Sequence, residues 1–413
     1  MRNDRLIAPA PGSNIPAILW LLILALAARV TVFIRQRGGA EFTAIDTSAL
    51  VGISVVALSV VMLFVSGRLG QTWKRMAGAS AGLLVGYYAL CAVSALWSPL
   101  PEYSFFRSVE TLSQLLAVFV ALSYCSSFEQ AERRVLLIAV LTMLLGMGVN
   151  VKFYGFSLSL ADWHTNSYSA SAAMIACYAV GEYMSGGRKL PGAVKWAGVA
   201  GVLGLALGTS SASTIAAFAG FALAAFLMKR WGMVFGGIAA ALLVVALGLG
   251  GSFLTNIVFP GKTEGQIATL HGRTQLWAAY AEDVKESPLY GNGFGVSARL
   301  SSFRYTTNPH NSVFSVLLGT GAAGLLLAVA AMLRLTRETL HATRWTRPGA
   351  VGAAAAMGAG IVNSMGLPII GDIWMAPTVV LASMLALHVL FVVTPQTDLA
   401  HDPAIGLCCA ARS

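Results

Sequence analysis

The chain has 413 residues, of which 57% are hydrophobic and only 11% are charged. A soluble domain has about 25% charged residues, so this composition excludes an ordinary soluble protein and indicates an all-α, polytopic membrane protein. The formal net charge of +10 would suit a nucleic-acid partner, but most basic residues fall in alternate short loops, as in oriented membrane proteins. We therefore expect membrane lipids, and no nucleic acid, around the chain.

Apolar segments of roughly membrane-spanning length recur along the whole sequence. The first one follows Arg2 and Arg5, and an uncleaved helix is favoured there over a cleaved signal peptide because apolar residues continue to Ile34. We expect about twelve transmembrane helices, at residues 15–34, 48–66, 78–97, 109–126, 135–151, 167–184, 194–209, 212–228, 232–251, 311–333, 349–369 and 373–393.

The distribution of Lys and Arg predicts the orientation. With a cytoplasmic N-terminus, the cytoplasmic segments hold 17 basic residues and the short external loops hold 4. Both termini are then cytoplasmic. The expected organisation is nine spans in residues 1–251, a periplasmic loop with short amphipathic helices at 252–310, three spans in 311–393, and a cytoplasmic tail at 394–413.

Charged residues within the expected spans are few. Arg29 and Glu110 lie near predicted outer ends, and Glu182 lies near an inner end. Ion-coupled transporters keep ionisable residues near the middle of the membrane, so this pattern weakens a transporter hypothesis without excluding a flippase whose cavity is lined by hydroxyls. A transporter or flippase of lipid-linked sugars remains the alternative function.

The long external segment, residues 252–310, contains a predicted helix that starts at Arg273. Leu276, Trp277, Tyr280 and Val284 recur at helical spacing, which predicts an amphipathic helix at the membrane interface with both aromatics as anchors. Arg273 would stand at the start of this helix, where the helix dipole and a guanidinium both favour a phosphate. An arginine that binds lipid headgroups is the equally weighted alternative.

Two further polar groups lie on the same predicted face. His310 is flanked by Asn308 and Asn311 at the start of a span, where it could act as a general base or simply cap the helix. His164 and Asn166 precede the sixth span in a second cluster, for which an ordinary polar loop is as good an interpretation. No spacing typical of metal ligands appears, and no metal or cofactor is expected.

Three stretches of the sequence resemble the bacterial O-antigen ligase superfamily, which includes O-antigen ligases, surface-polysaccharide polymerases and protein O-oligosaccharyltransferases. The first runs from Ser94-Ala95-Leu96-Trp97-Ser98-Pro99 to Arg107. The second is Gly272-Arg273 to Trp277 followed by Pro288-Leu289 and the alternating Gly291, Gly293 and Gly295. The third is His310-Asn311 followed by Gly321 and Gly324. The three occur in the order typical of the family, and the long outer loop also fits.

The resemblance implies a metal-independent, inverting glycosyltransferase in the bacterial inner membrane. Its donor would be a glycan linked to undecaprenyl diphosphate, and its acceptor another glycan, lipid A core or a protein. By the family pattern, Arg273 would bind the diphosphate and stabilise the leaving group. His310 would serve as the general base or bind the diphosphate.

Two departures from the family pattern are present. Ser210-Ser211-Ala212-Ser213-Thr214 lacks the arginine that many members carry there, so Arg304, Arg299 or Arg107 would have to replace it. Gly319 stands where many members have a glutamate. Gly291 and Gly293 form a tight turn that lets the backbone approach another group closely, and we expect them at the substrate together with Asn308, Asn311, His164 and Asn166.

Overall fold

The computed structural model describes residues 14–32, 47–154, 166–208, 210–246, 273–296, 308–372 and 374–393. All regular structure within these ranges is helical. The long helices are α1 (Ile15–Val32), α2 (Thr47–Val65), α4 (Ser80–Val93), α5 (Pro101–Ser123), α6 (Phe128–Tyr154), α7 (Asn166–Ser185), α8 (Gly192–Ala206), α9 (Ser211–Leu227), α10 (Trp231–Ala246), α13 (Arg273–Glu286), α15 (Ser312–Arg344), α16 (Ala350–Asn363) and α17 (Ala376–Leu387).

Each of the twelve apolar segments expected from the sequence coincides with one of these helices. By length and composition, four helices in the described ranges can cross a membrane, namely α5, α6, α15 and α17 with its π-helical extension to Val393. A fifth span results if α2 and the short helix after it are taken together. The all-helical fold is confirmed and includes several helices of membrane-spanning length, and the number of twelve spans stays a prediction.

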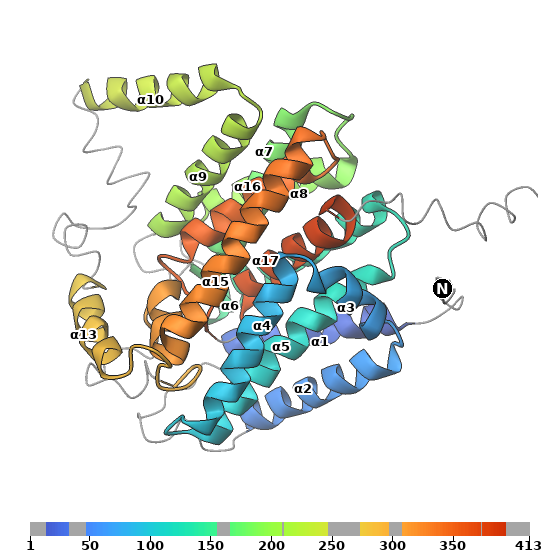
Figure 1. Ribbon diagram of the computed structural model, residues 1–413. Helices are drawn as coiled ribbons and strands as arrows, with labels where there is room; N and C mark the ends of the chain where they lie inside the picture. Colours follow the sequence, from blue (N-terminus) through green and yellow to red (C-terminus); the bar gives the residue numbers. More distant parts are fainter. Residues whose placement is uncertain are drawn as a thin grey trace, which may run out of the picture.

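The centre of the bundle is built by close packing of small residues. Helix α16 packs against α7 and α9, and α4 packs against α5 and α15 (Figure 1). A Cβ added to Gly181 would lie 2.8 Å from Gly352 Cα, and one added to Gly220 would lie 2.8 Å from Ala355 O. Glycine therefore lets these backbones touch, as is common where helices associate in lipid.

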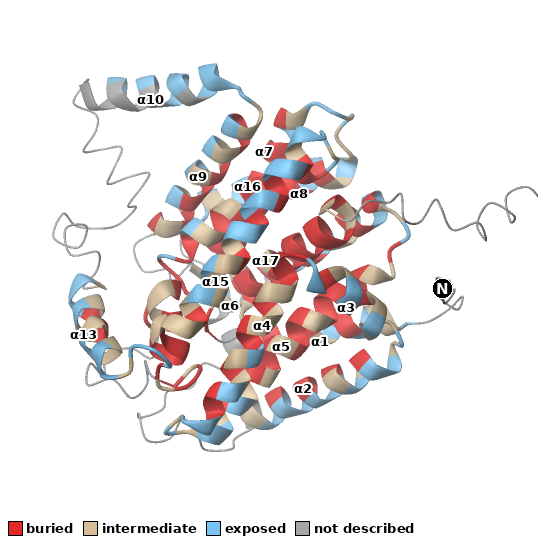
Figure 2. Cartoon of the chain, viewed as in Figure 1, coloured by how far each residue is buried: buried red, intermediate tan, exposed pale blue. Residues whose placement is uncertain are grey.

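The outer helices differ from the central ones in exposure. Figure 2 shows pale blue residues along α2 and α10, whereas α16 and α17 are largely red. Leu58 is 53% exposed on α2 and Leu243 is 59% exposed on α10. Large apolar side chains on the outside of a bundle suit contact with lipid chains.

One helix was not expected. Helix α3 (Leu69–Ala77) follows α2 after a bend of 92° and has Lys74 and Arg75 in its last turn. It is only 9 residues long, too short to span a membrane.

Helix α13 confirms the helix predicted from Arg273 but corrects its surroundings. Tyr280 is fully buried, and Trp277 stacks on Phe314 of α15 with 6.3 Å between ring centroids. Tyr280 also packs on Phe314, and Leu276 contacts the same cluster. The prediction that these aromatics anchor the helix in the membrane interface was wrong, because the apolar face of α13 is covered by α15.

Candidate functional site

The glycine-rich segment after α13 is inserted into a break in helix α15. Gly321 interrupts the helix with φ 63° and ψ −158°. On one side of the break, the Asn292 amide donates to Leu318 O at 2.8 Å, and on the other the Ala322 amide donates to Pro288 O at 2.8 Å. Backbone groups that the break would leave unsatisfied are thus paired, which a helix inside a membrane requires.

The glycines of this segment permit its close approach to α15. A Cβ added to Gly291, at φ 63°, would lie 2.6 Å from Thr320 N. A Cβ added to Gly293, at φ 99°, would collide with Ser98 Oγ and lie 2.8 Å from Ser104 Oγ. The close approach expected of both glycines is therefore made to the protein itself. Contact of these residues with substrate stays a prediction.

The early sequence stretch packs on the same glycine segment. Ser94 Oγ accepts a hydrogen bond from Phe294 N at 3.0 Å, and Trp97 Nε1 donates to Tyr290 O at 3.2 Å. Residues about 200 positions apart are thereby joined. The three stretches that carry the family resemblance meet in one assembly.

Arg107 lies beneath the glycine segment. Its Nη1 contacts Glu110 Oε2 at 2.8 Å, and its guanidinium stacks over the Tyr103 ring at 4.9 Å. A Cβ on Gly295 would lie 3.8 Å from Arg107 Cβ. The Arg107 charge is balanced by a buried carboxylate, which fixes the guanidinium in place.

His310 is presented on a constrained turn. Its φ of 52° is a left-handed conformation, and its amide donates to Asn308 Oδ1 at 2.7 Å. Asn311 then caps α15, accepting from Val313 N at 2.7 Å and Phe314 N at 3.4 Å. Strained non-glycine residues held by their neighbours are frequent at active sites. Both asparagines therefore orient the turn that carries His310.

Arg273 and the His310 turn are connected through α13. Arg273 is the first residue of the helix, and Trp277, one turn later, donates from Nε1 to Pro309 O at 3.0 Å. Pro309 immediately precedes His310. The two candidate catalytic residues therefore lie at the same corner of the molecule.

Two further helix ends meet at this corner. A Cβ placed on Gly366, after α16, would lie 3.3 Å from Arg273 Nη1 and 2.6 Å from Ala212 Cβ at the start of α9. The Ser312 amide at the start of α15 donates to Ser364 O at 2.8 Å. The first turns of α9, α13 and α15 thus surround the end of α16.

The charge of Arg273 has no counter-charge among the described residues. Arg273 is partly buried, and no described carboxylate lies within ion-pair distance of its guanidinium. Burial lowers the pKa of Arg273. A half-buried guanidinium is stabilised by an anionic partner, so this corner favours an anion.

A hydrogen-bonded network beside Arg273 was missed in the sequence. Asn363 Nδ2 donates to Ser213 Oγ at 2.8 Å, and Ser213 Oγ contacts Ser210 Oγ at 3.0 Å. Ser213 is fully buried, Asn363 is 1% exposed and Ser210 is 7% exposed. The serine run at residues 210–213 was the signal in the sequence that could have indicated this network.

Several predicted site residues are not placed at this corner by the structure. Arg299, Arg304 and His164 lie outside the described residues, and Asn166 is the partly buried first residue of α7. Within the described ranges, no three His, Cys, Asp or Glu side chains gather as a metal site would require.

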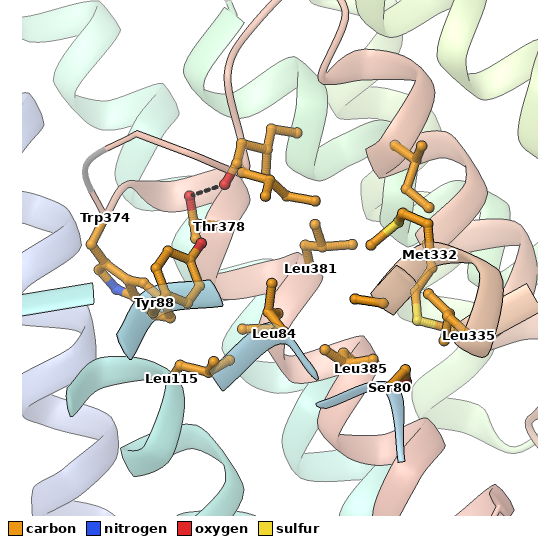
Figure 3. A pocket seen from close by; sticks show the side chains of 16 residues that line it. Ser80, Leu84, Tyr88, Leu115, Met332, Leu335, Trp374, Thr378, Leu381 and Leu385 are labelled. Carbon is orange, nitrogen blue, oxygen red and sulfur yellow. Dashed lines mark hydrogen bonds between the residues drawn. The ribbon is translucent and has the colours of Figure 1, made fainter. Parts of the chain in front are cut away.

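A separate cavity of about 40 Å³ lies inside the bundle (Figure 3). Apolar side chains line most of it, Tyr88 and Trp374 among them, and Thr378 donates to Ile369 O at 3.3 Å on its wall. No charged side chain lines it. An apolar void of this size suits neither a sugar nor a phosphate, so the cavity is distinct from the candidate site.

No curated protein matches the chain. Residues 196–329 match the family model described as O-Antigen ligase. The matched segment extends from α8 into the first part of α15, and it contains Arg273, the glycine segment, the His310 turn and the break at Gly321. The chain is therefore similar to the O-antigen ligase family over residues 196–329, the segment that holds these features of the candidate site.

Proposed function

We propose that the chain transfers a glycan from undecaprenyl diphosphate to an acceptor hydroxyl at the periplasmic face of a bacterial inner membrane. The family match and the helical bundle support this function. The observation that carries the proposal is the half-buried Arg273, which has no acidic partner in the described ranges and lies at the same corner as the His310 turn. Nucleotide sugars are absent outside the inner membrane, so an activated donor must arrive there on a lipid.

Arg273 binds the diphosphate of the donor. Its planar guanidinium offers paired N–H groups to phosphate oxygens, and it stabilises the charge that develops on the leaving diphosphate. The first turns of α9, α13 and α15 add their positive dipole ends at the same place. The Ser210–Ser213–Asn363 network stands where many family members carry a second arginine.

His310 acts as the general base. The acceptor oxygen attacks the anomeric carbon and the bond from that carbon to the diphosphate oxygen breaks. The acceptor proton passes to the imidazole, and undecaprenyl diphosphate leaves. Attack opposite the leaving group inverts the anomeric configuration. This reaction needs no metal, and we expect EDTA to leave the rate unchanged.

The remaining predicted site residues contribute to substrate binding in this proposal. They are Arg107, Arg299, Arg304, Asn308, Asn311, His164, Asn166, Gly291 and Gly293. Twelve spans with both termini in the cytoplasm would place residues 252–310 on the periplasmic side. The acceptor is another repeat unit for a polymerase and lipid A core for a ligase.

The test is a transfer assay with purified protein variants. His310→Ala should abolish transfer, and Arg273→Lys should lower it by roughly 10²-fold or more, because an ammonium lacks the planar fork. The matched control is Arg337→Lys, which changes an exposed residue far along α15 and should keep the wild-type rate. Full transfer by the Arg273→Lys variant would exclude the diphosphate role. Unchanged transfer in His310→Ala would exclude His310 as the general base, whereas no transfer by the wild type would favour the flippase alternative.

A further inference from the structure

The end of helix α16 forms a support between the two candidate catalytic residues. The helix ends at Asn363, whose carbonyl oxygen accepts from Gly366 N at 2.8 Å and from Leu367 N at 2.9 Å. These bonds close a tight turn over residues 363–367, which we call the α16 turn. Asn363 is 1% exposed and Ser364 is 2% exposed, so the first half of the turn is enclosed by the protein.

Helix α9 holds the α16 turn from one side. The Asn363 side chain donates from Nδ2 to Ser213 Oγ at 2.8 Å, and Ser213 is fully buried in the first turn of α9. Ser210, which caps α9, contacts the Ser213 hydroxyl at 3.0 Å. A buried amide bonded to a buried hydroxyl fixes the turn in one position relative to α9.

Helix α15 holds the same turn from the other side. Ser364 O accepts from Ser312 N at 2.8 Å. The segment that follows returns to the same residue, because Ile370 N donates to Ser312 Oγ at 3.2 Å. Ser312 is the first residue of α15 and lies two positions after His310. The α16 turn is therefore joined to the base of the turn that carries His310.

Gly366 brings the α16 turn against the Arg273 guanidinium. A Cβ added to Gly366 would lie 3.3 Å from Arg273 Nη1 and 2.6 Å from Ala212 Cβ. The φ of Gly366 is not positive, so its backbone conformation does not itself require glycine. The missing side chain instead provides space for the guanidinium and for the start of α9.

The electrostatic environment of the α16 turn suits a guanidinium that binds an anion. The carboxyl end of a helix carries partial negative charge, which stabilises a nearby cation. In the described ranges, no carboxylate lies within ion-pair distance of Arg273. A carboxylate at this position would compete with a phosphate for the guanidinium, whereas a helix end supplies only partial charge.

We propose that Asn363 and Gly366 are positioning residues for Arg273, and that they set where its guanidinium lies relative to the His310 turn. This inference rests on the proposed function, in which Arg273 binds the diphosphate of the donor. Asn363 fixes the turn to α9, Ser364 joins it to α15, and Gly366 provides the space for the guanidinium. Because small displacements of a binding group weaken its contacts strongly, a side chain at position 366 should impair diphosphate binding.

Calorimetric titration of the purified full-length protein with farnesyl diphosphate tests this role. Gly366→Ala would displace the guanidinium by a few tenths of an ångström, and we expect the affinity to fall by about tenfold. The matched control is Gly358→Ala, whose added Cβ would lie 2.7 Å from Leu223 Cδ2. This control disturbs the same pair of helices, α16 and α9, more than one turn before the end of α16, and should bind like the wild type.

Double variants show whether the loss acts through Arg273. Gly366→Ala added to Arg273→Lys should lower the affinity by less than about twofold further, since lysine has no Nη1 to displace. A further loss of about tenfold in that background would overturn the positioning role. Equal binding by Gly366→Ala and Gly358→Ala would overturn it as well.

Asn363→Ala is a second variant, which opens space instead of adding a clash. Loss of the hydrogen bond to Ser213 should loosen the turn and lower the affinity by about three- to tenfold, and this loss should also vanish in the Arg273→Lys background. Absence of farnesyl diphosphate binding by the wild type would overturn the proposed function and this inference together. Binding by the wild type that Asn363→Ala leaves unchanged would overturn the inference alone.

Discussion

At the scale of single residues, the glycines near the site hold protein segments together. Gly291 has a positive φ and also touches the α15 backbone, with Thr320 N 2.6 Å from the position of an added Cβ. Gly295 has a similar φ of 72°, but its nearest neighbour would be Tyr103 Cε1 at 3.7 Å. Both positions therefore have a left-handed backbone conformation that disfavours any residue other than glycine. Only Gly295 has space for an added Cβ.

This difference predicts unequal effects of alanine. Gly291→Ala should lower the free energy of unfolding by about 1–3 kcal/mol more than Gly295→Ala, because only the first substitution forces the segment out of the break in α15. Thermal unfolding of both variants in the same detergent measures the difference. Equal losses would mean that the segment does not rely on this contact.

The turn at His310 gives a second prediction at the residue scale. Asn308→Ala removes the oxygen that accepts from the His310 amide, and transfer should fall by roughly tenfold because the imidazole loses its orientation. Asn308→Asp keeps an acceptor at the same place and should retain most of the rate. Steady-state transfer rates of the two variants are the measurement, and identical rates would refute the orienting role.

At the scale of elements, one arginine joins helices at the end of the bundle opposite the site. Arg188 contacts Glu132 of α6 and Glu182 of α7, and Glu182 Oε1 accepts from Gly352 N of α16 at 3.2 Å. Both glutamates are buried, and Tyr178 donates to Glu132 at 2.7 Å. The loop between α7 and α8 is thereby attached to three helices.

Removal of Arg188 should lower the free energy of unfolding. Arg188→Ala leaves two buried carboxylates without their counter-charge, and we expect a loss of about 3–5 kcal/mol in the free energy of unfolding. The double variant Arg188→Ala with Glu182→Gln should recover part of the loss. Chemical denaturation in detergent measures both, and a neutral Arg188→Ala would contradict the role assigned to these contacts.

The elements also show which parts of the fold could be predicted from the sequence. Long apolar segments predicted the main helices because length and hydropathy are local properties. Helix α3 was missed because 9 amphipathic residues carry no spanning signal. The apolar face of α13 was predicted correctly. Its sequence pattern is the same whether lipid or α15 covers that face, so the sequence could not indicate which of them does.

The candidate site was predictable only as a set of residues. Family motifs identified Arg273, the glycine segment and His310, but not that Pro288 and Asn292 hydrogen-bond across a break in α15. Pairing between distant segments depends on the whole fold. The Asn363 network likewise joins α9 to α16 across 150 positions, with no local pattern to indicate it.

At the scale of the whole molecule, the distribution of basic residues predicts the orientation in the membrane. A fluorescent protein fused to the C-terminus should be fluorescent, because the distribution of basic residues predicts that this end is cytoplasmic. Alkaline phosphatase fused within residues 252–272 should be active, since that segment would face the periplasm. The reverse pattern would invert the topology and move Arg273 away from the lipid-linked donor.

The most direct test of the proposed function is the product formed by the purified wild-type protein. It is incubated with an undecaprenyl-diphosphate oligosaccharide, with and without lipid A core, and the products are separated by mass. We expect a glycan joined to a new hydroxyl together with free undecaprenyl diphosphate, either as longer lipid-linked chains without core or as glycan on the core. No transfer to either acceptor, under conditions in which an established ligase is active, would contradict the assignment as a glycosyltransferase.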